Sequence, residues 1–439
     1  MIKDGAGWLT KWLLCVIVGM LLICGVYILP TNNMKENVAR SSAVFDYEGI
    51  YPQLANGYKY MQLDNYTDSI MLGAAIFNEN AGIKEKAVNN YHIDCSELSP
   101  ELALTNYANE APYNFYSVSY SRYWHGYLVP LKTALLFLDY ADIRVLNFII
   151  QSILLFYIVT LFYKAKIEAY LSSFGIMILV LNPLAIALSL QYSSIYYIML
   201  LASIALLKTY TKKGGINYSV MKNIVFFTGV MSSFFDLLTY PLVPLGVVMV
   251  LYIILCSKDK EHSGFLGEAV KLLVVWGFGY FGMWMGKWVI GSLMLHANLF
   301  ADAVGQIGLR VSSPSQISEG NRLNAILQNL KVLLKWPFVI LFFVWSIYYI
   351  YKMKKDTMTK IPVIHVSKYI RGNYKTVVIL GVLALLPLLW LWLLANHSIT
   401  HYWFTYRELA ISVFSICSLL IMFKEKCGME TNENEENTK

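Results

Sequence analysis

The sequence has little charge for its length. Charged residues make up 14% of the 439 residues, whereas hydrophobic residues make up 57%, and the mean hydropathy is +0.50. Soluble domains are about one-quarter charged, and the apolar stretches here lack the polar face of a helix on a soluble protein. These two absences exclude a soluble globular protein. They predict an all-α polytopic integral membrane protein.

Every second connection between the apolar stretches is rich in lysine, whereas the alternate connections are acidic or neutral. Because membrane insertion retains Lys and Arg on the cytoplasmic side, and about 20 apolar residues cross a bilayer, this pattern predicts about ten transmembrane helices. Both termini are then cytoplasmic, in a multi-pass protein of the cell membrane. The predicted spans are 13–29, 143–163, 171–188, 193–207, 224–238, 242–255, 270–295, 333–351, 377–394 and 409–423.

Cysteine pairs and soluble-enzyme motifs are also missing. Cys95 is the only cysteine of residues 30–142, so that segment has no disulfide of its own. Walker, GxSxG and HExxH motifs are absent. A GxGxxG string at 277–282 lies inside a predicted span and indicates close helix packing, not a dinucleotide site. The net charge of +7 lies beside the spans, which points to the lipid bilayer as a partner and not to nucleic acid.

Residues 30–142 form the largest connection and are predicted to lie on the outer face. They hold seven Lys and Arg against thirteen Asp and Glu. Within them, residues 124–140 are apolar but short, which favours a helix lying in the membrane interface over a crossing. The chain is predicted to form one membrane domain, 1–439, with a disordered cytoplasmic tail at 424–439.

Two acidic stretches of this loop are the first candidates for chemistry. They read FDYEGIY at 45–51 and DNYTDSIML at 64–72. A carboxylate among such aromatic and aliphatic residues would deprotonate an acceptor hydroxyl or hold a divalent metal ion. Glu48 and Asp68 stand out by this context. The alternative is solvated charge on an ordinary outer domain.

Two cations lie where positive charge is unusual. Lys287, between two tryptophans in a predicted span, would bind a lipid phosphate or extend to the headgroups. Arg407 lies at the outer end of the last span, and its guanidinium would bind a phosphate. The alternative for Arg407 is an ion pair with Glu408 or with the region of Asp68.

Three further polar residues lie near predicted span ends. Asp236 is at a tight turn between two spans, where it would pair with Lys287 or line a cavity. His397 and His401 share a spacing of four residues, but no third ligand is evident, so a zinc site is not predicted.

The chain resembles the GT-C class of integral-membrane glycosyltransferases in architecture over most of its length. The stretch 45–51 followed by 64–72 is similar to that family's loop acid and juxtamembrane helix. The stretches 284–288 and 396–407 are similar to its donor-phosphate contacts. The Lys-, Asn- and Ile-rich composition also resembles that of membrane proteins of low-GC Gram-positive bacteria.

The resemblance implies an inverting transfer of a sugar from a polyprenyl-phosphate donor to a cell-envelope glycan or lipid acceptor on the outer face. Glu48 or Asp68 would act as the base. The implied donor-phosphate contacts are Lys287, Arg407 and His397. The residues implied to orient the substrate or a divalent cation, Mg²⁺ or Mn²⁺, are Asp236, Asp46, Asp64 and His401.

Two other classes remain open. A transporter or flippase for a lipid-linked or anionic solute would use Lys287, Arg407 and Asp236 as binding charges and need no base in the long loop. A polysaccharide polymerase or an acyltransferase would depend more on His125 or His397.

Overall fold

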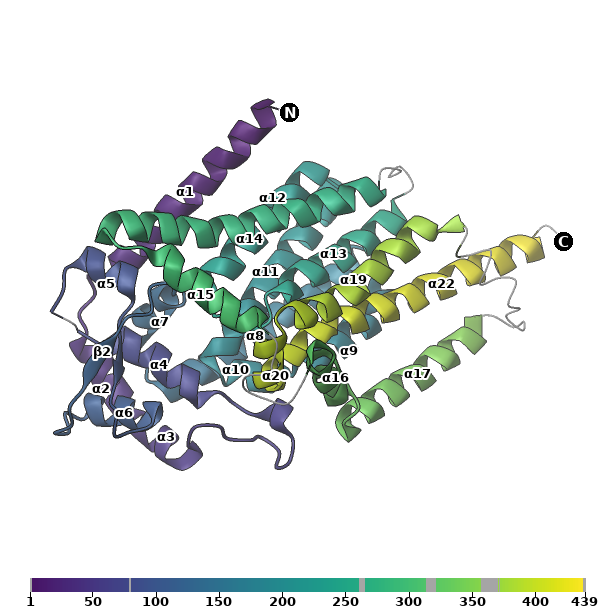
Figure 1. Cartoon of the computed structure of the whole chain (residues 1–439). Coiled ribbons are helices and arrows are strands. Elements are labelled where there is room, and N and C mark those ends of the chain that lie inside the picture. The colour runs from purple at the N-terminus through teal and green to yellow at the C-terminus, as the bar shows by residue number, and fades with distance from the viewer. Residues whose placement is uncertain are drawn as a thin grey trace.

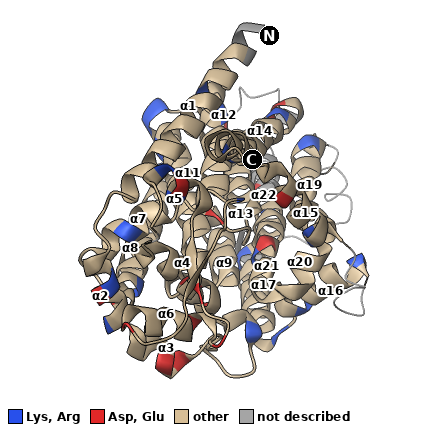
Figure 2. Cartoon of the chain, turned by 60° about the vertical axis from the view of Figure 1, so that its left-hand side comes forward, with Lys and Arg blue, Asp and Glu red and all other residues tan. Residues whose placement is uncertain are grey.

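The computed structural model describes residues 2–78, 80–259, 265–312, 321–356, 370 and 372–436. These residues form a bundle of helices, as predicted, with one short antiparallel ladder between β1 (His92–Asp94) and β2 (Tyr116–Val118) (Figure 1). Charged residues are sparse over the helices, and acidic residues appear at α3 (Ser42–Glu48) (Figure 2). The class of all-α membrane protein is therefore confirmed.

Seven helices of the described residues are long and apolar enough to cross a membrane. They are α1 (Ile2–Val26), α8 (Tyr140–Lys164), α11 (Leu190–Lys213), α14 (Phe265–Leu295), α17 (Trp336–Asp356), α19 (Tyr374–Leu393), and the run Tyr402–Glu425, which includes α21 (Tyr402–Thr405), η4 (Tyr406–Leu409) and most of α22 (Ala410–Glu436). Each coincides with a predicted span. The predicted total of about ten spans is not confirmed.

The other three predicted spans fall on shorter or less apolar helices, which are α12 (Tyr218–Phe235), α13 (Leu242–Lys258), and the pair α9 (Leu171–Leu181) and α10 (Pro183–Ala187). The predicted span 171–188 is broken at Asn182, which has a left-handed backbone with φ of 59°. Pro183 follows and starts α10. The left-handed backbone of Asn182 ends α9, and Pro183, which lacks a backbone N–H, is suited to the first position of the next helix.

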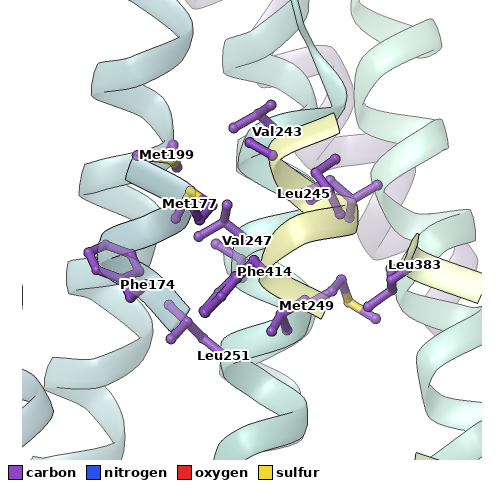
Figure 3. Close-up of a cluster of buried hydrophobic side chains, with 14 of the residues drawn as sticks. Phe174, Met177, Met199, Val243, Leu245, Val247, Met249, Leu251, Leu383 and Phe414 are labelled. Atoms are coloured by element: carbon purple, nitrogen blue, oxygen red, sulfur yellow. The ribbon is translucent and has the colours of Figure 1, made fainter. Parts of the chain in front are cut away.

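α13 is the central helix of the bundle. Its residues from Leu242 to Cys256 are all buried, and it is apolar on every face, as a helix surrounded by other helices must be. The surrounding side chains include Phe174 and Met177 of α9, Met199 of α11, Leu383 of α19 and Phe414 of α22 (Figure 3). A Cβ added at Gly246 would lie 2.5 Å from Cγ2 of Ile411. Glycine at this position therefore lets α22 approach α13 closely.

Glycines also bring α14 against α12 and α1. A Cβ at Gly229 of α12 would lie 2.5 Å from a carbonyl oxygen of α14, and one at Gly279 would lie 2.5 Å from the carbonyl oxygen of Phe226. A Cβ at Gly286 would lie 2.3 Å from Val16 of α1. Small residues are what membrane helices use for such close contact. The prediction that 277–282 serves helix packing is confirmed.

The described part of residues 30–142 forms a layer across one end of the helices, which we call the loop layer (Figure 1). Its helices are α2 (Asn32–Arg40), α3, α4 (Asn65–Ile76), α5 (Ile83–Asn89), α6 (Pro100–Ala108) and α7 (Leu128–Leu135). Its core includes Met34, Phe45, Leu72, Leu104 and Leu128. The first residues of α1 and the last of α22 lie away from the loop layer (Figure 1).

Several short elements complete this end of the molecule. They are η1 (Lys59–Met61), α15 (Leu299–Val311), α16 (Arg322–Leu333) and α20 (Ala395–Thr400). At the opposite end, α22 continues as a helix to Glu436, which differs from the disordered tail predicted for 424–439. Lys, Glu and Met are good helix formers, so this stretch extends a helix that the bundle has already started.

Candidate functional site

Buried lysines of this structure bind the ends of helices. Lys287, which is 0% exposed, donates to the carbonyl oxygens of Ala87 and Val88 at the end of α5, at 3.1 and 2.9 Å. Lys132 donates in the same way to Ala75 near the end of α4, at 2.6 Å. The last carbonyls of a helix have no partner within it and carry partial negative charge, so an ammonium group is favourable there. Lys287 therefore holds α14 to α5, a use that the sequence did not reveal.

Arg407 also binds the end of a helix. Its Nε donates to the carbonyl oxygen of Leu181, the last residue of α9, at 2.9 Å. Its Cζ lies 4.4 Å from the ring centroid of Tyr192, and its NH2 is buried without a partner among the described residues. The alternative expectation, an ion pair with Glu408 or Asp68, is not met within the described residues. Its NH1 donates to the carbonyl oxygen of Trp403 at 3.3 Å, so Arg407 is largely committed to the backbone and only its NH2 group lacks a partner among the described residues.

The two acids implied to be catalytic, Glu48 and Asp68, are linked through one arginine. Arg144 NH1 donates to Glu48 Oε1 at 2.8 Å, and Arg144 NH2 donates to the Tyr140 hydroxyl at 2.8 Å and to Asn65 Oδ1 at 2.9 Å. The Tyr140 hydroxyl donates in turn to Asp68 Oδ2 at 2.6 Å. We call these five residues the Arg144 network. It joins α3, α4 and α8.

Asp68 also binds the start of α11. Its Oδ2 accepts from the backbone N–H of Leu190 at 2.8 Å, and its Oδ1 accepts from that of Gln191 at 3.0 Å. The side chain is fully buried, and burial raises its pKa to about 6, against the lowering effect of these hydrogen bonds. A carboxylate at a helix N-terminus satisfies backbone donors that would otherwise have no partner. Both oxygens of Asp68 are therefore in use.

Asp236 and His397 fix the turn between α12 and α13. Asp236 accepts from the backbone N–H of Thr239 at 2.9 Å and from its hydroxyl at 2.5 Å. His397 Nε2 lies 2.8 Å from the carbonyl oxygen of Leu238, and burial lowers the pKa of this histidine well below its usual value, so the neutral ring donates. Leu238 has φ of 70°, which is rare for leucine. The expected pair between Asp236 and Lys287 is not formed.

Asp64 is a buried acid that accepts a backbone hydrogen bond through only one of its carboxyl oxygens. It is 3% exposed and caps α4, where Oδ1 accepts from the backbone N–H of Thr67 at 3.0 Å. No backbone group of the described residues donates to its Oδ2, and a hydrogen bond from the Thr67 side chain also acts on the carboxyl group and lowers its pKa. Burial raises the pKa of Asp64 to about 7, and the nearby charge of Asp68 raises it further. Asp64 therefore changes its protonation state near neutral pH.

Two tyrosines, Tyr51 and Tyr66, lie within electrostatic range of Asp64. Burial raises the pKa of both tyrosines, and the charge of Asp64 raises it further. Their rings stack with centroids 6.1 Å apart and an interplanar angle of 13°. Tyr51 contacts Trp403 at 5.8 Å between centroids, and Trp403 contacts His401 at 5.2 Å. These contacts join the loop layer to the connection between α19 and α22.

Two arginines pack against Tyr120 and Tyr123. The Cζ of Arg122 is 4.4 Å from the ring centroid of Tyr120 and 5.7 Å from that of Tyr123, and the Cζ of Arg310 is 6.0 Å from that of Tyr123. Arg122 pairs with Asp302 at 3.5 Å, whereas Arg310 forms no ion pair with a described residue. The Nε of each arginine is buried without a partner in the described structure. Buried donors without partners are costly, so an anion bound here would be stabilised.

Electrostatic effects also link the arginines to the aromatic group around Tyr51 and Tyr66. Tyr120 raises the pKa of Tyr66, and Arg310 lowers the pKa of His401, so each pair lies within electrostatic range. We call the whole set the loop-side cluster, which consists of Tyr51, Asp64, Tyr66, Tyr120, Arg122, Tyr123, Arg310, His401 and Trp403. Of the sequence candidates, it includes Asp64 and His401.

An apolar groove of about 1260 Å³ runs along α8, α11 and α12, with α7 at one end. Leu190 and Phe235 line it near the loop layer, and Asn223 lines it near the other end of α12. The backbone of Leu190 binds Asp68, and Asp236 follows Phe235 in the chain. The groove therefore extends along much of α12 and ends beside two buried acids.

The remaining candidates contribute less. Asp46 is exposed and forms no hydrogen bond with a described residue. No group of three or more His, Cys, Asp or Glu in the described ranges is arranged to hold a metal ion. A divalent cation would therefore need ligands from a substrate as well, such as the phosphate oxygens of a donor.

Sequence reasoning missed the arginines of the site. Arg144 had a usable signal, because an arginine in the first turn of an apolar span is as unusual as Arg407. No sequence signal joined Arg122 to Arg310, because they are far apart in the chain and both approach Tyr123 only in the folded structure. No family model matches the chain, and no curated protein and no solved structure matches it either.

Proposed function

We propose that this protein is a GT-C-type membrane glycosyltransferase that moves a sugar from a polyprenyl-phosphate donor to a cell-envelope acceptor on the outer face. The observation that carries this proposal is that the loop-side cluster includes a buried acid, Asp64, and two arginines, Arg122 and Arg310, whose Nε groups have no partner among the described residues. Transfer from a phosphate needs a base for the acceptor hydroxyl and positive charge for the departing phosphate.

In the proposed step, Oδ2 of Asp64 takes the proton of the acceptor hydroxyl while the acceptor oxygen bonds to the anomeric carbon of the sugar. The bond from that carbon to the phosphate oxygen breaks, and the lipid phosphate leaves with the electron pair. Arg122 and Arg310 stabilise the added negative charge. The acceptor attacks the face opposite the leaving group, so the anomeric configuration inverts.

Asp64 replaces Glu48 and Asp68 as the proposed base for a physical reason. Both oxygens of Asp68 already accept hydrogen bonds, and Glu48 is paired with Arg144. A proton acceptor needs an oxygen that a substrate can reach. The pKa of Asp64, raised to about 7, also suits a base that works near neutral pH.

The groove along α12 supports a lipid-linked donor. Its lining is mostly apolar, and its end near the loop layer lies beside the first turn of α11. The next residues of that turn include Tyr192, whose ring packs on Arg407. A polyprenyl chain in this groove would hold a donor near the loop layer without leaving the membrane.

A flippase for a lipid-linked solute is the second candidate, because the groove continues along α12 as far as Asn223. That length suits the passage of a lipid between leaflets as well as the binding of one. A flippase would move the intact lipid and would need no base at Asp64.

The test is release of lipid phosphate from radiolabelled polyprenyl-phosphate sugars by the purified full-length protein in lipid nanodiscs. We expect release by the wild type, and a rate that is lower by at least about 100-fold in Asp64→Asn. Asp46→Asn, which changes an exposed acid of the same layer, is the matched control and should keep its activity.

The result that contradicts the transferase is equally specific. Binding of a donor without release of lipid phosphate, in the presence of membrane extract as a source of acceptor, would exclude it. Movement of that donor between the leaflets of proteoliposomes would then support the flippase.

A further inference from the structure

Two tyrosines of the loop-side cluster present their rings to the surface. Tyr51 is 41% exposed and Tyr66 is 40% exposed, although their rings stack on each other. Neither hydroxyl forms a hydrogen bond with a described residue. Trp403 packs against the edge of Tyr51 and extends this surface. The three rings thus offer an apolar face with free polar groups at its rim.

The charges beside these rings are acidic. Asp64 and Glu101 raise the pKa of Tyr51, and Asp94 raises that of Tyr66. A ligand with negative charge would be repelled at this surface, whereas the arginines lie beyond Tyr120. The surface therefore suits a neutral ligand that has hydroxyl groups and an apolar ring face.

The backbone holds Tyr51 in place. The preceding helix ends at Gly49, where φ is 66°, a value that glycine adopts freely. Two backbone hydrogen bonds then close the loop, from Leu54 to Met61 at 3.1 Å and from Leu63 to Pro52 at 2.9 Å. A surface fixed before binding loses less conformational entropy when a ligand arrives.

We infer that Tyr51, Tyr66 and Trp403 form a stacking platform for a neutral saccharide, and that the acceptor is therefore a glycan rather than a phosphate-rich polymer or a lipid. Apolar faces of sugar rings stack on aromatic rings, while sugar hydroxyls bond to polar groups at the rim. Tyr66 lies in the first turn of α4, the helix that Asp64 caps, so the platform and the proposed base belong to the same helix end. The identity of this ligand as the acceptor rests on the proposed function.

The experiment measures saccharide binding by the full-length protein in nanodiscs, using saturation-transfer NMR and calorimetry. The probes are maltotetraose, cellotetraose and chitotetraose, with poly(glycerol phosphate) as the anionic comparison. We expect at least one neutral probe to bind, and its Kd to rise about tenfold in Tyr51→Ala and in Tyr66→Ala. Tyr51→Phe keeps the ring and should change the Kd less than threefold.

Two controls separate binding from folding and from chemistry. Tyr47→Ala removes a tyrosine of the same layer that is 92% exposed, and it should leave binding unchanged. Asp64→Asn should retain saccharide binding even if transfer is lost. Binding therefore tests the platform, and transfer separately tests the proposed base. Three results would each overturn the inference. They are no binding of any of the three neutral probes, a Kd in Tyr51→Ala equal to that of the wild type, and tighter binding of poly(glycerol phosphate) than of the neutral probes.

Discussion

The Arg144 network and the loop-side cluster both hold buried acids of the loop layer, yet those acids are bound differently. Asp68 accepts three hydrogen bonds and Glu48 pairs with Arg144, whereas the only partner of the Asp64 side chain among the described residues is Thr67, and no backbone group donates to its second oxygen. Removing a charge from water costs several kcal/mol unless its partners compensate. A satisfied network is explained by the fold alone. An unsatisfied cluster that includes two arginines needs a further cause, and a ligand supplies one.

The largest expected effect comes from breaking the satisfied network. Arg144→Met should lower the free energy of unfolding by about 3–5 kcal/mol, because it removes the cation that pairs with the partly buried Glu48 and that supports the buried Asp68 through Tyr140. Thermal unfolding of the purified protein in detergent measures this. Lys35→Met is the control, because its partner Glu110 has a side chain that is 79% exposed, and such surface pairs contribute about 0–1 kcal/mol. Equal stability of the two variants would show that the network does not support the fold.

The next effect separates the two aspartates by stability. Asp68→Asn should cost about 1–3 kcal/mol, because its amide cannot accept all the hydrogen bonds now made to the carboxylate. Asp64→Asn should cost less than about 1 kcal/mol, because asparagine also caps a helix N-terminus well. The same unfolding measurement decides between them. A larger loss in Asp64→Asn would reverse the comparison.

The two arginines should affect the donor rather than the fold. Arg122→Met and Arg310→Met should each raise the Kd for a polyprenyl phosphate about tenfold, as expected when one charge-assisted contact to a phosphate is lost. Lysine at either position should restore part of the affinity, since it keeps the charge. Lys84→Met, which removes an exposed cation of the loop layer, should leave the Kd unchanged. An unchanged Kd in both arginine variants would show that the donor phosphate does not bind at this cluster.

The smallest effect is a pH dependence. A base acts when it is deprotonated, and the pKa of Asp64 is raised to about 7, so transfer should rise with pH through neutrality. The deprotonated fraction grows about tenfold between pH 6 and pH 8 for such a pKa. Rates of lipid-phosphate release under single-turnover conditions measure this profile. A flat profile over that range would exclude Asp64 as the base.

The sequence predicted the membrane class and seven of the spans because long apolar runs and glycine spacing are local signals. It predicted less of the site. Lys287 looked like a phosphate contact because nothing local reveals Ala87 and Val88, which lie some 200 residues away. The break at Asn182 had a local signal in the following proline, yet the apolar run around it favoured one continuous span. Contacts between distant segments decided the uses of the charged residues.

The most direct measurement compares Asp64→Asn with Asp68→Asn in one assay of lipid-phosphate release, with each rate corrected for the folded fraction. We expect Asp64→Asn to fold like the wild type and lose about 100-fold or more of its activity. Asp68→Asn should be less stable but release lipid phosphate at a rate within about threefold of the wild type per folded molecule. Full activity in Asp64→Asn, with activity lost in Asp68→Asn, would contradict the assignment of Asp64 as the base.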